Sequence, residues 1–381
     1  MERIYCDHAA TTPLSDVAWA AMEPFLREQF GNASEPHWAG REARAGLDQA
    51  RAVAAEALGV ETRELIFTGG ASEADNLAVL GRLGAAPGRI VASPFEHPAV
   101  WLQLEALAER GYEIVLAQSD SDGRVPAAEF ERHVRPGDLV CCCIWGNNVT
   151  GVIQPIAEIA AICAERGVPL HVDAVQACAC VPVDVGALPG AVTVAAAAHK
   201  LGGPKGVGLL CGRGLDSLVS VIHGGPHERG LRPGTENVAG ASGFAAALAH
   251  AQAGEARDPR RRALRDAYEV AVAGSLERVR AVGADAERLP GHSLTLIDGV
   301  RGATLVSLLD EQGIAAAATS ACASASAKPS HVLIALGLSE DEARSALRLS
   351  FGELNDASQL PRIVEAIRDA VTALRIAAAA A

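Results

Sequence analysis

The sequence predicts an α/β fold, in which a mainly parallel sheet is covered by helices and a smaller α+β part follows at the C-terminus. From about residue 64, short apolar runs alternate with patterns typical of helices. One run, Leu139–Trp145, is apolar throughout, as expected for a strand buried on both faces. This repeated strand–helix–strand order indicates parallel strands with helices on the faces of the sheet.

The elements of the large part follow from these runs in chain order. The predicted strands are Leu65–Thr68, Arg89–Ser93, Tyr112–Ala117, Leu139–Trp145, Pro169–Val172, Val192–Ala196 and Val207–Leu210. The predicted helices are 72–80, Pro98–Arg110 and Ile156–Arg166. Ligands of such sheets bind at the carboxyl ends of the strands, next to the amino ends of the following helices. Polar residues at those ends are therefore candidates for one shared site.

A change of composition at 254–265, which is charged and contains Pro259, marks the predicted domain boundary. The large domain is 13–254, and the small domain comprises 1–12 and 255–381. Its predicted helices are Ala263–Val279, Thr304–Gln312, Ser330–Leu336 and Glu340–Ala346, and its predicted strands are Ser293–Ile297 and Leu347–Phe351. A loop at 318–328 carries Cys322.

Composition excludes several classes of protein. The net charge is −13 and no basic run exceeds Arg260–Arg262, so we expect no stable nucleic-acid binding by this chain alone. No stretch of about 18 apolar residues predicts a membrane helix, and the polar N-terminus does not resemble a signal peptide. Nine cysteines without a regular framework indicate reduced thiols. We therefore expect a cytoplasmic protein.

Lys200 gives the strongest chemical signal. It follows an apolar strand and precedes Gly202, Gly203 and Pro204, which let the backbone pass close to a pocket. A lysine that forms a Schiff base needs such a partly desolvated position, because desolvation lowers its pKa and frees the amine. The alternative is a surface lysine on a glycine-rich turn. We predict that Lys200 binds pyridoxal 5′-phosphate (PLP).

Asp173 ends an apolar strand, where an acid is costly unless it has a partner. The pyridine nitrogen of PLP is such a partner, and its protonation makes the cofactor an electron sink. A helix N-cap is the alternative interpretation. The strand–glycine–helix junction Gly69–Asn76 is suited to bind a phosphate through backbone N–H groups and Ser72, although serine is also a common N-cap.

Three further residues are candidates for chemistry. His97, after a strand, is suited to ring stacking and proton transfer, although a lone histidine is usually structural. Arg348 is a charge within an apolar strand and needs a carboxylate partner, such as that of a substrate. Cys322 lies in a loop of small residues, which favours an exposed nucleophile, whereas an ordinary loop thiol is the equal alternative. No cluster has the spacing of a metal site.

These motifs, in this order, resemble the cysteine desulfurases of the class V aminotransferase superfamily, which are fold-type I PLP enzymes. The resemblance covers nearly the whole chain, and the long loop around Cys322 is typical of the group that serves iron–sulfur cluster assembly and tRNA thiolation. Its motifs are Tyr5–Pro13, Gly31–Ser34 with His37 and Gly40, Gly70–Asn76, Glu96–His97, Asn147–Asn148, Asp173–Gln176, His199–Lys200, His223–Asn237, Ser320–Cys322 with Ser324, and Pro329–Leu333.

The resemblance implies a role for each cofactor ligand. Lys200 binds PLP covalently and moves the Cα proton of the substrate, while Asp173 pairs with the pyridine nitrogen. Gln176 and Asn148 bond the phenolic oxygen, and His97 stacks on the ring and acts as acid and base. The phosphate is held by Ala71, Ser72, His199 and, from the second subunit of a homodimer, Thr235.

It also implies a reaction. Asn32 and Arg348 clamp the carboxylate of L-cysteine, and Cys322 attacks its sulfur, which leaves a persulfide on Cys322 and releases L-alanine. The persulfide passes to an acceptor protein: an iron–sulfur scaffold, a tRNA- or DNA-thiolation enzyme, or a sulfur carrier. The alternatives are another class V enzyme, such as a selenocysteine lyase or an aminotransferase, and a catalytically weak binding scaffold.

Three departures from the family pattern bear on these alternatives. Ala197 stands where the family has a phosphate-binding serine, which predicts weaker retention of PLP by about 1 kcal/mol. Val149 replaces a glutamate near the site, and Ala33 with Glu35 alters the loop after Asn32. These changes either specialise the enzyme or weaken it.

Overall fold

A seven-stranded sheet forms the centre of the larger part of the molecule. The computed structural model describes residues 3–254, 259–319 and 329–379. The strand order is β2-β8-β7-β6-β5-β3-β4, and the five strands from β7 to β4 are parallel, whereas β8 is antiparallel to both of its neighbours. The strands are β2 (Leu65–Thr68), β3 (Arg89–Ala92), β4 (Glu113–Leu116), β5 (Val140–Cys142), β6 (Leu170–Asp173), β7 (Val192–Ala197) and β8 (Gly208–Cys211). The predicted mainly parallel sheet is confirmed.

Alternate residues of these strands pack on opposite faces of the sheet, as the period of a strand requires. Ile66 and Leu210 pack with α3 (Ala71–Leu80), whereas Phe67 and Leu209 belong to the larger core on the other face. Both faces are buried, so the strands are apolar along their whole length. The covering helices also include α4 (Pro98–Glu109), α5 (Ala127–His133), α6 (Ile156–Glu165) and α7 (Ala177–Cys180).

Four long helices were not predicted from the sequence. They are α1 (Asp16–Arg27), α2 (Trp38–Ala57), α8 (Val238–Ala253) and α13 (Leu360–Ala379). The α8 helix packs against α1, α2 and α7, and most of its residues are buried. A helix that is buried on nearly all sides is rich in small and apolar residues all round, so its sequence carries no amphipathic pattern.

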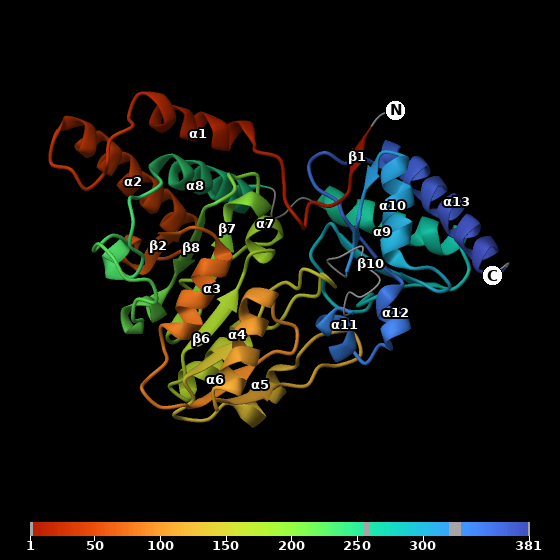
Figure 1. Cartoon of the computed structure of the whole chain (residues 1–381), viewed down its shortest axis with the longest axis horizontal. Coiled ribbons are helices and arrows are strands. Elements are labelled where there is room, and N and C mark those ends of the chain that lie inside the picture. Colours follow the sequence, from red (N-terminus) through yellow and green to blue (C-terminus); the bar gives the residue numbers. More distant parts are fainter. Residues whose placement is uncertain (1–2, 255–258, 320–328, 380–381) are drawn as a thin grey trace.

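The smaller C-terminal part is α+β, as predicted, and lies beside the large sheet on the right of Figure 1. Its four-stranded antiparallel sheet has the order β12-β13-β10-β9. The strands are β9 (Val279–Ala281), β10 (His292–Ile297), β12 (Ala317–Ala318) and β13 (Ala346–Ser350). Its helices are α9 (Pro259–Ser275), α10 (Gly302–Glu311), α11 (His331–Ala335), α12 (Glu340–Arg344) and α13.

Two predicted helices extend into the strand that follows them. The helix expected over Glu340–Ala346 is α12, which ends at Arg344, and Ala346 instead starts β13. The helix expected over Ala263–Val279 is α9, which begins at Pro259 and ends at Ser275, and Val279 instead starts β9. Proline is favoured in the first turn of a helix, where no backbone N–H is needed. Arg278 has a φ of 57°, which is incompatible with a continuing helix and separates the two elements.

The N-terminal segment belongs to the C-terminal part. Strand β1 (Ile4–Tyr5) pairs in parallel with β11 (Ile314–Ala315), and Ile4 and Cys6 lie in the core formed by α9, α10 and α13. Strand β1 and helix α13, from opposite ends of the sequence, therefore lie on the same side of the molecule (Figure 1). The division into 13–254 and 1–12 with 255–381 stays a prediction. Among the described residues, every helix is too short or too polar to cross a bilayer.

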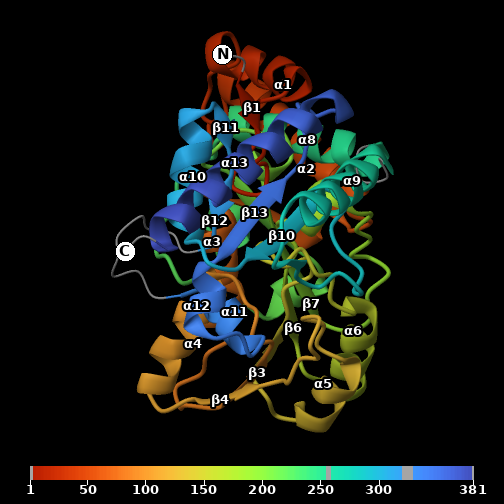
Figure 2. The same ribbon diagram turned by 90° about the vertical axis from the view of Figure 1, so that its right-hand side faces the viewer.

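The C-terminal part also touches the large part through α11, which lies near α4 (Figure 2). The ring of His331 stacks on that of Trp101 with centroids 4.6 Å apart. Nε2 of His331 lies 2.9 Å from the carbonyl oxygen of Glu96, the residue before His97. The contact places α11 next to the strand end that carries His97.

Candidate active site

A cavity of about 630 Å³ lies at the carboxyl ends of β5, β6 and β7, in front of the amino end of α3. This is the edge at which parallel sheets bind their ligands. The cavity brings together most of the predicted cofactor ligands: Ala71, Ser72, His97, Asn148, Asp173, Gln176, His199 and Lys200. The roles given to them above stay predictions, and the geometry decides what each can do.

Lys200 is half-buried at the end of the short 3-10 helix Ala198–Lys200, which directly follows β7. Its Nζ donates hydrogen bonds to the carbonyl oxygens of Ala9 at 2.7 Å and Ala10 at 2.8 Å. Burial and then the positive charge of Arg348 lower the pKa of the Lys200 amine to about 8. About a tenth of the amine is therefore uncharged at pH 7, far more than for an ordinary lysine, and is available as a nucleophile or base.

Asp173 is the last residue of β6 and is 3% exposed. Its Oδ1 accepts a hydrogen bond from the Val175 N–H at 2.9 Å. Burial raises the pKa of the carboxyl group, while His97, the Val175 N–H and Lys200 oppose the rise. An acid in such a place is suited to hold a ring N–H that carries positive charge.

His97 is the N-cap of α4 and lines the same cavity. Its Nδ1 accepts a hydrogen bond from the Ala99 N–H at 3.1 Å, so the proton of the neutral ring is on Nε2. Burial lowers the pKa of the imidazole, with Asp173 acting in the opposite direction. His97 is thus a neutral aromatic ring with one N–H to donate.

The amino end of α3 forms the other end of the cavity. Its N-cap, Gly70, has no side chain to satisfy the first N–H groups, and Ser72 is exposed there. A Cβ at Gly208 would lie 2.5 Å from the Gly70 carbonyl carbon, so only glycine allows β8 to approach this turn. Nδ1 of His199 lies 3.1 Å from Oγ1 of Thr11, and burial lowers the pKa of His199 to about 4.

These groups fit PLP. Unsatisfied N–H groups and a hydroxyl at a helix amino end match a phosphate, and a buried carboxyl group at the end of β6 matches a pyridine nitrogen. The amide of Gln176 is anchored because its Nε2 donates to the Ala9 carbonyl oxygen at 2.8 Å, and its oxygen stays available in the cavity. Lys200 is the amine that can bind the aldehyde carbon.

Arg348, on β13, brings a charge from the C-terminal part to the edge of the site. Its Nη2 forms an ion pair with Oδ1 of Asp7 at 2.6 Å, and its Nη1 donates to the carbonyl oxygen of Asn148 at 2.9 Å. Its Nε is buried and has no partner among the described residues. The guanidinium therefore keeps a donor for a further acceptor, such as a substrate carboxylate.

Besides Arg348 at its edge, two predicted residues do not line this cavity. Asn32 lies between α1 and α2, where its Oδ1 accepts from the Ser34 N–H at 3.0 Å, and this segment is at the far left of Figure 1. Thr235 is exposed and lies just before α8. Cys322 falls outside the described residues. The role of each stays a prediction.

The structure shows where the residues that depart from the family pattern lie. Ala197, the last residue of β7, lines the cavity and is 2% exposed. Val149 is buried in the large core, where its carbonyl oxygen lies 3.1 Å from Nε2 of His292. Ala33 is buried and its carbonyl oxygen accepts from Arg44, whereas Glu35 is exposed. Of these residues, only Ala197 faces the predicted cofactor.

Sequence reasoning missed several residues of the site. Thr11 and Lys205 line the cavity, Asp7 holds Arg348, and Asp75 lies beside Asp173 with His171 as its partner. A histidine two positions before Asp173 in an apolar strand was a readable signal, because alternate residues of a strand share a face. Asp75 gave no such signal, since an acid within a helix is usually exposed.

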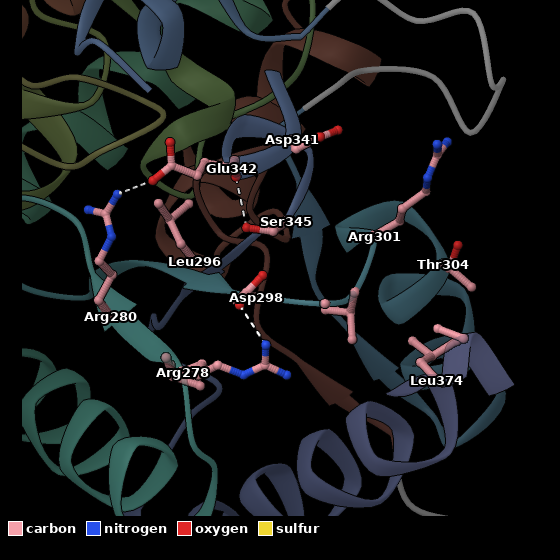
Figure 3. A pocket seen from close by; sticks show the side chains of 14 residues that line it. Arg278, Arg280, Leu296, Asp298, Arg301, Thr304, Asp341, Glu342, Ser345 and Leu374 are labelled. Atoms are coloured by element: carbon pink, nitrogen blue, oxygen red, sulfur yellow. Dashed lines mark hydrogen bonds and ion pairs between the residues drawn. The ribbon is translucent and has the colours of Figure 1, made fainter. Parts of the chain in front are cut away.

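A larger cavity, of about 780 Å³, lies in the C-terminal part (Figure 3). Its charged residues largely pair with each other: Arg278 with Asp298 at 2.9 Å and Arg280 with Glu342 at 3.1 Å. None of the predicted site residues lines it. We therefore assign the site to the cavity of Lys200.

Comparisons with known proteins agree with this assignment. A family model for class V aminotransferases matches residues 4–363. The IscS-like cysteine desulfurase of Mycobacterium tuberculosis is 40% identical over 99% of this chain and 98% of its own length. A NifS-like protein has a structure with a TM-score of 0.89 and 29% identity over 97% of this chain and 100% of its own. A structure of SspA in complex with cysteine has a TM-score of 0.79 and 30% identity, covering 91% and 98%.

The matched family and the site agree on one chemistry. The family model and the desulfurase relatives extend over nearly the whole chain, and the PLP enzyme predicted from Lys200 and Asp173 is the kind of enzyme that they describe. The chain belongs to the cysteine desulfurases of the class V aminotransferase family and is a PLP-dependent enzyme.

Proposed function

We propose that this enzyme converts L-cysteine into L-alanine, that Cys322 receives the sulfur as a persulfide, and that an acceptor protein then takes it. The Cβ–S bond of cysteine breaks and an S–S bond forms on Cys322, and the proton that the Cys322 thiol loses is balanced by one that Cβ gains. The observation that carries the proposal is the single cavity that joins Lys200, Asp173 and His97, with Arg348 at its edge.

The side chains of the chain have separate tasks in this reaction. Bound PLP withdraws electrons from the substrate Cα. Lys200, with a pKa of about 8, can take and return a proton at Nζ near neutral pH. Neutral His97 can donate from Nε2 while Ala99 fixes its ring. Asp173 holds the negative charge that stabilises a protonated ring nitrogen.

Arg348 would bind the substrate carboxylate. In the protein without substrate, its guanidinium is held by Asp7 and the carbonyl oxygen of Asn148. A substrate carboxylate could bind Nε of Arg348 and share Nη2 with Asp7. Asp7 would then keep its ion pair with Arg348 when the substrate binds. A charged hydrogen bond of this kind contributes about 1.5–3 kcal/mol, which is enough to select an amino-acid carboxylate.

We also propose a homodimer in which Thr235 binds the phosphate of the partner's cofactor. Helices α1 and α2 lie away from the C-terminal part (Figure 1), and several large apolar side chains in and near them are exposed. They come from α1, α2, the segment between them and the stretch before Thr235: Trp19, Phe30, Trp38, Val219 and Ile222. Such side chains are usual in the core of a protein–protein interface. Light scattering on the purified protein should give twice the mass of one chain.

Buried thiols support a reducing compartment, so we propose that the enzyme works in the cytoplasm. Cys141, Cys142, Cys143 and Cys211 are free and fully buried, and burial raises the pKa of each thiol well above its usual range. These four buried thiols are unsuited to a nucleophilic role, which we assign to Cys322. The acceptor of the persulfide is a protein that presents its own thiolate to Cys322.

The test is to incubate the purified enzyme with PLP, L-cysteine and a reductant and to quantify alanine and sulfide. We expect equal amounts of the two products, and loss of both in Cys322→Ala. Cys211→Ala is the matched control, because this thiol is buried away from the cavity. Turnover that survives Cys322→Ala would reject the persulfide step. Pyruvate in place of alanine would favour another class V reaction, and no product at all would favour a binding scaffold.

A further inference from the structure

A second carboxyl group lies beside Asp173 and takes no part in the roles described so far. Asp75, on α3, is 1% exposed. One oxygen of Asp75, one oxygen of Asp173 and one ring nitrogen of His97 lie within 4.8 Å of one another. Two buried carboxylates at this separation repel each other strongly, so one of them takes up a proton. Which of the two is ionised decides the charge that faces the cofactor.

The surroundings favour the charge on Asp173. Asp173 accepts the Val175 N–H, and the positive charge of Lys200 also favours its ionised form. Asp75 has no such help: its Oδ2 is buried without a partner among the described residues. The buried acids Asp173 and Glu96 both raise the pKa of Asp75, after burial itself. An oxygen without a donor costs less free energy on a neutral acid than on an anion.

His171 provides the partner that a neutral Asp75 needs. It lies on β6 two residues before Asp173, so both side chains are on the face covered by α3. Its Nε2 is 3.1 Å from Oδ1 of Asp75. Its Nδ1 is 3.3 Å from Oγ1 of Thr193, the residue directly opposite on β7.

The direction of these hydrogen bonds follows from the single proton of the Thr193 hydroxyl. That hydroxyl lies 3.4 Å from the carbonyl oxygen of Leu170, and when it donates there it accepts from Nδ1 of His171. The ring proton of His171 is therefore on Nδ1, and Nε2 has a lone pair that accepts the O–H of Asp75. Burial and the nearby guanidinium of Arg82 lower the pKa of His171 to about 3, so a charged imidazolium is excluded at neutral pH.

We propose that Asp75 is a positioning residue, held by His171 as a neutral carboxylic acid, so that the single negative charge of the buried pair stays on Asp173. The inference rests on the proposed function only in taking the pyridine nitrogen of PLP as the group that Asp173 binds. A neutral Asp75 holds its position beside Asp173 through its hydrogen bond to His171. Because it has no charge, it does not attract the protonated pyridine nitrogen away from Asp173.

The first test uses the apoprotein and needs no turnover. Infrared spectroscopy near neutral pH should show carbonyl bands of protonated carboxylic acids, one of which Asp75→Asn removes and Asp173→Asn does not. Burial raises the pKa of Glu96 to about 8, so this acid gives a second band, which Glu96→Gln identifies. Nitrogen-15 NMR should show His171 neutral with its proton on Nδ1. A band that depends on Asp173, a proton on Nε2, or uptake of a divalent cation by Asp75 and Asp173 would each overturn the proposal.

The second test compares two variants by PLP affinity and by the pH dependence of the cofactor absorbance. Asp75→Ala leaves Nε2 of His171 without a donor, and we expect PLP to bind about tenfold more weakly. Asp75→Asn should restore most of this affinity, because an amide N–H can donate to Nε2 in place of the acid. An Asn variant as weak as the Ala variant would overturn the proposal.

A third variant keeps the proposal testable if Asp75→Ala does not fold. Thr193→Val removes the hydroxyl that accepts from Nδ1 of the His171 ring. We expect a smaller fraction of His171 to carry its proton on Nδ1, and the carbonyl band of Asp75 to weaken. An unchanged ring and band would contradict the hydrogen-bond order. An enzyme that makes alanine but lacks the band would reject this proposal alone, whereas the band without any alanine would reject the proposed function alone.

Discussion

The cofactor end and the substrate end of the cavity are built in different ways. At the cofactor end, three polar side chains have partners that a ligand need not displace: Asp173 has the Val175 N–H, His97 has the Ala99 N–H, and His199 has Thr11. These groups lie on or directly after elements of the large sheet. Their geometry is set before any ligand binds, which lowers the cost of binding.

At the substrate end, the charged side chains of Lys200 and Arg348 form contacts that ligand binding must replace or share. Lys200 donates to the carbonyl oxygens of Ala9 and Ala10, and Arg348 pairs with Asp7. All three partners belong to the N-terminal segment that runs between the two parts of the molecule. The amine must leave these oxygens to react, so ligand binding exchanges contacts here. Substitutions at the two ends should therefore change different measured quantities.

Replacing Lys200 should have the largest effect, because it removes the group that joins the two ends. Lys200→Ala should lower kcat by about 10⁴-fold or more, since a base and a nucleophile are lost together. It should also abolish the visible absorbance that PLP gives when it is bound covalently to a lysine. Lys205→Ala, in the same cavity, should keep that absorbance. A Lys200→Ala enzyme with the full absorbance would show that another amine binds the cofactor.

Replacing Arg348 should act mainly on substrate binding. Arg348→Ala should raise KM for L-cysteine about 100-fold, the equivalent of one charged, bidentate contact, and should change PLP affinity little. Steady-state kinetics and equilibrium PLP titration separate these quantities. Arg344→Ala, on the exposed α12, is a control for loss of a surface charge. A large loss of PLP affinity in Arg348→Ala would mean that the two ends are not independent.

The pH dependence of cofactor capture tests how the two ends are coupled. The pKa of Lys200 is about 8, and the charge of Arg348 is one of the causes that lower it. The uncharged amine is the reactive form, so the rate at which the apoprotein takes up PLP should rise with pH through a midpoint near 8 and level off above it. Arg348→Met should move the midpoint to higher pH. A midpoint near that of an ordinary lysine would contradict the burial of this amine.

The sequence predicted the cofactor end better than the substrate end, for a physical reason. Lys200, Asp173 and His97 follow apolar strands, and the topology of a parallel sheet brings such residues to one edge. Arg348 was readable as a charge in a strand, but its partner Asp7 lies 341 positions away in the chain. Pairing between such distant segments is set by how the two parts of the molecule pack, which no local pattern encodes.

The sequence also did not predict which buried polar side chains pair with each other. Asp75 within a helix and His171 within a strand each have an ordinary local explanation, and only the packing of α3 on β6 joins them. Asn32 illustrates the reverse case. Family motifs placed it at the substrate, yet within one chain it lies in the segment between α1 and α2, outside the cavity.

Ala197→Ser should have the smallest effect, at the cofactor end alone. Ala197 ends β7 and lines the cavity, so a hydroxyl there would meet the cofactor phosphate. One added hydrogen bond of about 1 kcal/mol should tighten PLP binding about fivefold, with KM for L-cysteine unchanged. Ala196→Ser is the matched control, because Ala196 points to the opposite face and packs in the large core. It should lower stability without tightening PLP. If Ala197→Ser leaves PLP affinity as it was, a neighbour such as Thr11 or Lys205 already replaces the missing hydroxyl, and the cofactor end is complete as it stands.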